Sequence, residues 1–119
     1  MCRMIKLKRV YETVEDDNGY RVLVERLWPR GISKDKASLN EWMKEISPSP
    51  ELRKWYAHDV EKWLEFKQKY IEELSQKSEL VEEILIHSQQ GTMTLIYSAH
   101  DEQHNSALVL KEYLEGFYR

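Results

Sequence analysis

Arginine, histidine and asparagine side chains follow the apolar runs of this chain. Arg26 and Arg30 follow a central apolar run, and His104 and Asn105 follow the last one, near the start of a predicted helix. Arginine binds phosphate or carboxylate through two parallel hydrogen bonds, and the N-terminus of a helix offers backbone N–H groups to an anion. These residue types therefore predict a site for a small anionic ligand that carries phosphate or carboxylate groups.

The candidate ligand-binding residues lie at the ends of predicted strands, in the turns that follow, or at a junction between predicted helices. They are Arg9, Tyr11, Arg26, Trp28, Arg30, His58, Ser98, His104 and Asn105. In an open parallel sheet, ligands bind beyond the carboxyl ends of the strands, where such side chains converge. The residues assign no catalytic group and no cofactor, so whether the protein is an enzyme stays open.

Several candidates also have an ordinary structural interpretation. Arg26 follows Glu25, and the two could form a structural ion pair instead of meeting a ligand. Trp28 suits packing more than stacking on a ligand, and His58 suits a cation at a helix end. Arg30 lies in a Pro-Arg-Gly turn and fits ligand contact better, because functional side chains favour loops at strand ends.

Nucleophilic and metal chemistry are only weakly indicated. Ser98 lies near His100 and His104, but no G-x-S-x-G sequence surrounds it, and a serine near a helix start is often a cap. The two histidines have a spacing that suits metal on one helical face, yet no third ligand is evident, so no metal is expected. Cys2 is the only cysteine, which excludes an internal disulfide and a cysteine zinc site, and we assign it no role.

The strands that must position these residues are predicted from hydrophobic patterning. They cover residues 5–10, 20–27 and 92–99. The third is almost free of charge, which predicts a central strand covered on both faces. The connection over 11–19 is short for a parallel crossover, so the first two strands could instead form an antiparallel hairpin.

Helices are predicted to start at five capping signals. These are Ser38, Ser49, Asp59, Ser78 and Asp101. Ser38 and Glu41 have the spacing of a capping box for a helix that runs to Ile46. Ser49 precedes Pro50, which is favoured at the first helical position. The predicted fold is α/β: a small, mostly parallel sheet of about three strands packed with about five helices, in one domain over 1–119.

Composition narrows the function classes. The 119 residues carry 18 basic and 21 acidic side chains, a net charge of −3, which disfavours a nonspecific nucleic-acid binder. Nucleic acid stays an alternative partner because six cations could share one face: Lys6, Lys8, Arg9, Arg21, Arg26 and Arg30.

A second alternative is a homodimer or partner-binding module, since four Trp and seven Tyr could leave rings exposed at an interface. No apolar run suits a membrane span or a signal peptide, so no membrane partner and a cytoplasmic location are expected.

Four blocks of the sequence resemble one known family. They are KRVY at 8–11, GYRVLVERLWPRG at 19–31, SPSPELRKWYAHD at 47–59 and TLIYSAHDEQHNSALVLKEYL at 94–114. In this order they resemble the domain-of-unknown-function family 488, in its short YeaO-like branch. The resemblance implies a small bacterial or archaeal cytosolic α/β protein, without an established activity.

The resemblance also bears on single residues and on topology. Arg26, Arg30, Ser98 and Asn105 fall inside the family's signature blocks, which supports their importance without assigning a role. Members of the short branch usually have Asp where this chain has Glu25. Longer relatives favour a helix between the first two strands, which implies the parallel arrangement rather than the hairpin.

Overall fold

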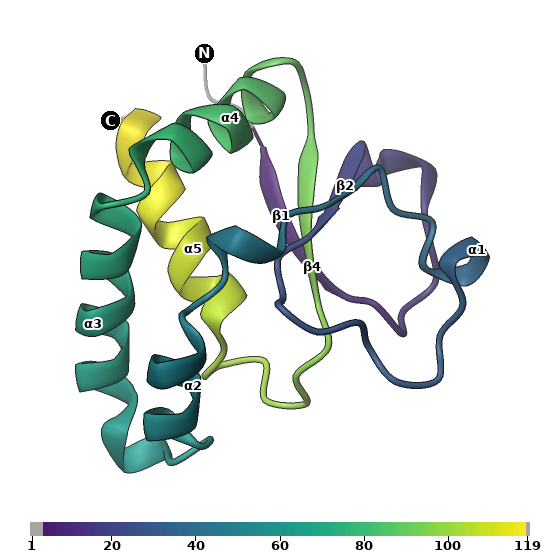
Figure 1. Cartoon of the computed structure of the whole chain (residues 1–119). Helices are drawn as coiled ribbons and strands as arrows, with labels where there is room; N and C mark the ends of the chain where they lie inside the picture. Colours follow the sequence, from purple (N-terminus) through teal and green to yellow (C-terminus); the bar gives the residue numbers. More distant parts are fainter. Residues whose placement is uncertain (1–3, 119) are drawn as a thin grey trace.

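The computed structural model describes residues 4–118 and contains a four-stranded, all-parallel sheet (Figure 1). The strands are β1 (Ile5–Arg9), β2 (Tyr20–Leu23), β3 (Glu41–Trp42) and β4 (Met93–Tyr97). Their order across the sheet is β1-β4-β2-β3. The predicted α/β class is confirmed, with four strands where about three were expected. Cys2 lies outside the described residues.

β4 lies at the centre of the sheet, as its lack of charge predicted. All of its residues are buried. Met93 is paired with Ile5 of β1 on one side and with Tyr20 of β2 on the other. Because β1 and β2 are both parallel to β4 and flank it, the alternative of an antiparallel hairpin between them is wrong.

The link 10–19 takes the place of the crossover helix that usually joins parallel strands. It crosses the sheet because β4 lies between β1 and β2, and the Thr94 hydroxyl of β4 donates to the Asn18 carbonyl at 2.6 Å. Gly19 ends the link with a φ of 65°, and a Cβ there would lie 2.1 Å from the Thr92 carbonyl oxygen. Only glycine permits this close approach of the backbone at the start of β2.

Five α-helices occur within residues 4–118, which agrees with the predicted number. They are α1 (Lys34–Ala37), α2 (Pro50–Tyr56), α3 (Trp63–Ser75), α4 (Ser78–Gln89) and α5 (Ser106–Glu115). Figure 1 shows α2, α3, α4 and α5 on one side of the sheet, and α1 with long loops on the other. Ser49 caps α2 as predicted, since its hydroxyl accepts from the Leu52 N–H at 3.1 Å.

The helix predicted from Ser38 to Ile46 is wrong. Ser38 instead ends α1 in the left-handed conformation, and the chain then forms β3. Beside the open edge of β2, the Asn40 N–H donates to the Arg21 carbonyl and the Asn40 Oδ1 accepts from the Arg21 N–H, each at 2.8 Å. These long-range backbone partners stabilise an edge strand more than the local capping box stabilises a helix.

The predicted start of the last helix at Asp101 is also wrong. α5 begins at Ser106, and its N-cap is Asn105, whose Oδ1 accepts from the Leu108 N–H at 2.8 Å. The Asp101 carboxylate is already used in the preceding turn, where it accepts from the N–H of Gln103 at 2.9 Å. A cap therefore forms, but one turn later than the first capping residue in the sequence.

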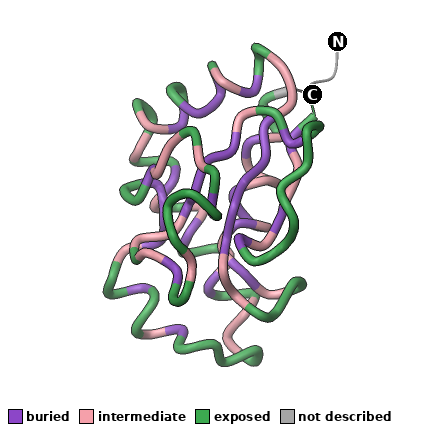
Figure 2. Tube along the Cα trace, turned by 90° about the vertical axis from the view of Figure 1, so that its right-hand side faces the viewer, coloured by how far each residue is buried: buried purple, intermediate pink, exposed green. Residues whose placement is uncertain are grey.

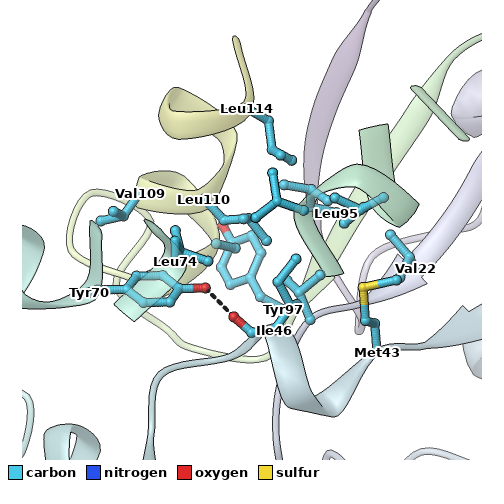
Figure 3. Packing of buried hydrophobic residues seen from close by; sticks show 14 of the residues in the cluster. Val22, Met43, Ile46, Tyr70, Leu74, Leu95, Tyr97, Val109, Leu110 and Leu114 are labelled. Atoms are coloured by element: carbon cyan, nitrogen blue, oxygen red, sulfur yellow. Dashed lines mark hydrogen bonds between the residues drawn. The ribbon is translucent and has the colours of Figure 1, made fainter. Parts of the chain in front are cut away.

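The main core lies between the sheet and the helices. Val22 of β2 and Leu95 of β4 pack there with Leu110 of α5 (Figure 3). The Tyr70 hydroxyl, fully buried, donates to the Ile46 carbonyl at 2.8 Å, so the large ring brings no unsatisfied polar group into the core. Figure 2 shows buried residues along the inner segments and exposed ones along the outer turns.

A smaller apolar cluster lies on the opposite, loop-covered face. It contains Val10, Leu23, Ala37 and Ile96, with Trp28, Ile32, Leu39 and Trp42 packed against it.

Among residues 4–118, no helix has the length and apolarity needed to cross a membrane.

Candidate functional site

A cleft of about 880 Å³ lies beyond the carboxyl ends of β2 and β4. The loop after β2, the loop between β4 and α5, and helix α2 contribute its walls. All of the predicted site residues except Arg9 line it: Tyr11, Arg26, Trp28, Arg30, His58, Ser98, His104 and Asn105. The parallel topology therefore brings together side chains that are far apart in the sequence.

Arg26 lines the cleft, and its guanidinium group is only partly hydrogen-bonded by the described residues. Its Nε is buried and has no hydrogen-bond partner among the described residues. Its terminal nitrogens make only long contacts, one at 3.5 Å to the Ser47 carbonyl and one at 3.6 Å to a Glu45 carboxylate oxygen. Buried polar groups are nearly always hydrogen-bonded, so this donor is an exception among residues 4–118.

Two further guanidinium groups line the cleft without partners. Arg30 and Arg53 form no side-chain hydrogen bond or ion pair with any residue that the structure describes. Both residues are exposed. Sequence reasoning missed Arg53, because the amphipathic pattern of α2 draws attention to its apolar face. Three arginines of the cleft lining therefore have guanidinium N–H groups without an acceptor among residues 4–118.

Glu25 does not pair with Arg26. Its carboxylate accepts the Ser98 hydroxyl at 2.5 Å and the Ser98 backbone N–H at 3.1 Å. The ion pair considered as an alternative for Glu25 and Arg26 is therefore not formed, and the Ser98 hydroxyl donates to a carboxylate rather than to an imidazole.

The other carboxylate in the cleft lining is also occupied. Asp101 accepts from the backbone N–H of Gln103 at 2.9 Å and of His104 at 3.0 Å, and its second oxygen contacts the His104 Nδ1 at 2.9 Å. The hydrogen bond from Gln103, followed by those from His104, holds the pKa of Asp101 below its ordinary value. This acid is stabilised as an anion within its own turn.

Asn105 and Arg9 support the loop between β4 and α5. Asn105 is 5% exposed; besides capping α5, it donates from Nδ2 to the Asp101 carbonyl at 3.0 Å. The Arg9 guanidinium donates to the carbonyls of Ala99 at 2.8 Å and Ser98 at 3.1 Å, and it lies outside the cleft lining. The polar atoms of both side chains are hydrogen-bonded to the chain itself, so these two candidate residues position the loop.

The aromatic candidates hold the turn that carries Arg30. The Tyr11 hydroxyl donates to the Arg30 carbonyl, and the Trp28 Nε1 donates to the Ile32 carbonyl, both at 2.8 Å. Trp28 also meets Trp42 edge to face, with ring centroids 5.4 Å apart. Packing and hydrogen bonding thus fix the turn while one side of it faces the cleft.

His58 lies at the junction between α2 and α3, with backbone in the left-handed region. Its φ is 59° and that of Ala57 is 47°, which is uncommon for residues other than glycine. Its ring centroid is 6.3 Å from that of Tyr56, which also lines the cleft. Burial, followed by the charge of Asp101, raises the pKa of the Tyr56 phenol.

The six cations considered as a basic face do not stand free together. Lys6 pairs with Asp17, and Lys8 pairs with Glu15. Arg21 is 3% exposed and donates to groups on the loop-covered face.

Among residues 4–118, no three His, Cys, Asp or Glu side chains are grouped so that they could hold a metal ion.

Comparison with known proteins gives one family and several relatives. The family model described as "Inactive DUF488-N3 subclade" (DUF488-N3i) matches residues 4–119. "Uncharacterized protein YeaO" of Escherichia coli (strain K12) is 44% identical over 112 residues, which cover 94% of this chain and 97% of that protein. "Uncharacterized protein Mb3100c" of Mycobacterium bovis is 38% identical over 112 residues, or 94% of each chain. No solved structure matches this chain.

Proposed function

The chain belongs to the family described as the inactive DUF488-N3 subclade, and from that premise we propose that it binds a small anionic molecule in the cleft. The ligand carries a phosphate or carboxylate group and lies beyond the carboxyl ends of β2 and β4. One observation carries the proposal: the cleft's guanidinium groups keep free donors, while its carboxylates Glu25 and Asp101 are occupied by the chain itself.

The buried Nε of Arg26 gives an estimate of the free energy that a bound anion could contribute. A buried donor without a partner costs about 1–3 kcal/mol. An oxygen of a bound anion would remove that cost and would gain a charge-assisted hydrogen bond, which is about twice as strong as a neutral one. Arg30 and Arg53 supply further positive charge at the same cleft.

Two observations favour binding without a chemical step. The matching family is described as inactive. In addition, the Ser98 hydroxyl donates to Glu25, so it lacks the imidazole base that activates a serine nucleophile. A binding function in the cytoplasm fits the single cysteine, since disulfide-free chains are usual in reducing compartments.

The nucleic-acid alternative has less support than the small anion. Lys6 pairs with Asp17, and Lys8 pairs with Glu15. The Arg21 guanidinium donates to groups on the loop-covered face. The remaining free guanidinium groups line a concave cleft instead of an extended surface. A concave site with a few convergent polar groups is the usual form of a small-molecule site.

Thermal unfolding in the presence of organic phosphates, organic carboxylates and inorganic phosphate tests the proposal. A ligand that binds the folded state alone raises Tm. We expect Arg26→Ala and Arg30→Ala to fold and to bind the best ligand at least about tenfold more weakly, since a hydrogen bond to a charged group contributes about 1.5–3 kcal/mol.

Lys54→Ala is the matched control. Lys54 is exposed on α2 next to Arg53 and lies outside the cleft lining, so this variant removes the same charge without touching the site. It should bind as the unaltered protein does. The proposal fails if both arginine variants are stabilised by the ligand as much as Lys54→Ala is.

A further inference from the structure

Glu25 occupies the hydrogen-bond donors at the carboxyl end of the central strand. Its Oε1 accepts from the Ser98 hydroxyl at 2.5 Å, and its Oε2 accepts from the Ser98 backbone N–H at 3.1 Å. Ser98 is the first residue after β4, and both residues line the cleft. A carboxylate of the chain therefore lies where the strand end would otherwise offer two donors to a ligand.

Other hydrogen bonds fix both partners of this contact. The Trp42 Nε1 donates to the Glu25 carbonyl at 2.6 Å. Arg9 donates to the carbonyls of Ser98 at 3.1 Å and Ala99 at 2.8 Å. Because the backbone is held at both ends of the contact, the carboxylate is pre-positioned and does not depend on an adjustable loop.

An anion in this position changes what the cleft can bind. Ligands of parallel sheets usually meet the donors at the strand ends, but here those donors are taken, and the Glu25 charge repels a second anion. We propose that Glu25 determines the specificity of the cleft. It fills the strand-end position as an internal anion and directs the anionic group of the ligand to Arg26 and Arg30.

This inference rests on the proposed function and deepens it. It divides the cleft into a strand-end position, closed by Glu25, and a guanidinium side that stays open. The closed position has donors of its own once Glu25 is removed, namely the N–H and hydroxyl of Ser98. A change at one residue should therefore create a second anion site in the same cleft.

Variants of Glu25 separate the effect of its charge from the effect of its bulk. Glu25→Ala removes both and frees Ser98, whereas Glu25→Gln removes the charge and keeps the bulk. Asp101→Asn removes a charge elsewhere in the cleft lining. Calorimetry should show that Glu25→Ala binds inorganic phosphate at least about tenfold more tightly than both controls, because two charge-assisted hydrogen bonds become available. Equal affinities in the three variants overturn the inference.

A phosphate titration of the ¹⁵N-labelled, unaltered protein gives a second test that needs no variant to fold. The Nε resonances of Arg26 and Arg30 should shift, and the amide resonance of Ser98 should not. If the Ser98 amide shifts, Glu25 does not exclude an anion and the inference fails, while the proposed function stands. If neither arginine resonance shifts, the proposed function fails, whereas the Ser98 amide in Glu25→Ala still reports on Glu25.

Discussion

At the scale of single residues, the cations divide into those that hold the fold together and those that face the cleft. Arg21 is 3% exposed, donates to the Asn18 side chain at 2.7 Å and has its pKa lowered by burial. Lys8 is 8% exposed and pairs with Glu15. Arg26 leaves a buried Nε without a partner in the part of the chain that the structure describes. Because buried donors are normally hydrogen-bonded, the Nε without a partner supports the proposed ligand role of Arg26.

Tyr20 is expected to make the stability depend on pH in alkaline solution. Its hydroxyl donates to Glu41 at 2.9 Å, and its ring stacks on His87 with centroids 3.9 Å apart. Burial, followed by the hydrogen bond and charge of Glu41, raises the pKa of Tyr20 from 10.0 to about 12. The unfolded chain releases this proton near the lower value and the folded chain near the higher one. The free energy of unfolding should therefore fall as pH rises between them.

Urea unfolding of the unaltered protein and of Tyr20→Phe, at several pH values in this alkaline window, measures the effect. Burial also raises the pKa of Tyr70 and Tyr97, so both proteins should lose stability as pH rises. The loss should be shallower in Tyr20→Phe, because that variant lacks one of the protons concerned. Parallel pH profiles in the two proteins would contradict the role of Tyr20.

The residue types of the cleft were predictable from the sequence, but their partners were not. Strand ends rich in arginine and serine indicated where a site would form, and the parallel sheet brought them together. Glu25 and Ser98 are 73 positions apart, so no local pattern points to their hydrogen bond. Adjacency suggested Arg26 as the partner of Glu25 instead, whereas the Glu25 carboxylate accepts from Ser98.

At the scale of elements, capping signals predicted helix starts where no other partner competed for the same atoms. Ser49 with Pro50 starts α2 as expected. Asp101 does not start α5, because its oxygens accept from N–H groups of the preceding turn, and Asn105 caps the helix instead. The box at Ser38 failed because the edge of β2 offered long-range backbone partners, which local patterns do not reveal.

Ser38 should be replaceable by glycine with a gain in stability. It ends α1 with a φ of 50° and a ψ of 54°, and its N–H donates to the Lys34 carbonyl. The left-handed conformation costs an L-residue roughly 1–2 kcal/mol, and glycine avoids that cost. We expect Ser38→Gly to raise the free energy of unfolding in urea by about 0.5–1 kcal/mol after its greater unfolded-state entropy is included.

The sign of this change decides between two descriptions of Ser38. If Ser38 were the N-cap of a helix, glycine would lower the free energy of unfolding by a few tenths of a kcal/mol. Ser38→Ala is the control, because alanine keeps the Cβ that makes the left-handed conformation costly. Alanine should therefore give no gain.

At the scale of the whole molecule, the sheet joins two apolar clusters on its opposite faces. Val22 and Leu95 belong to the helix-covered cluster, and their neighbours Leu23 and Ile96 belong to the loop-covered cluster. The α/β class was predictable from the order of the predicted strands and helices, and the central position of β4 was predictable because its run lacks charge. β3 was not predictable, since a strand of two residues has no periodic signal.

Because both clusters use alternate residues of β2 and β4, we expect the chain to unfold as one domain. Trp28 and Trp42 report on the loop-covered face, and Trp55 and Trp63 report on the helix-covered face. Two double variants, Trp28→Phe with Trp42→Phe and Trp55→Phe with Trp63→Phe, leave one reporter pair each. In each variant, urea transitions followed by fluorescence and by far-UV circular dichroism should have the same midpoint. An earlier fluorescence transition confined to the variant that keeps Trp28 and Trp42 would mean that the loop-covered face opens by itself, because its contacts are weaker than those under the helices.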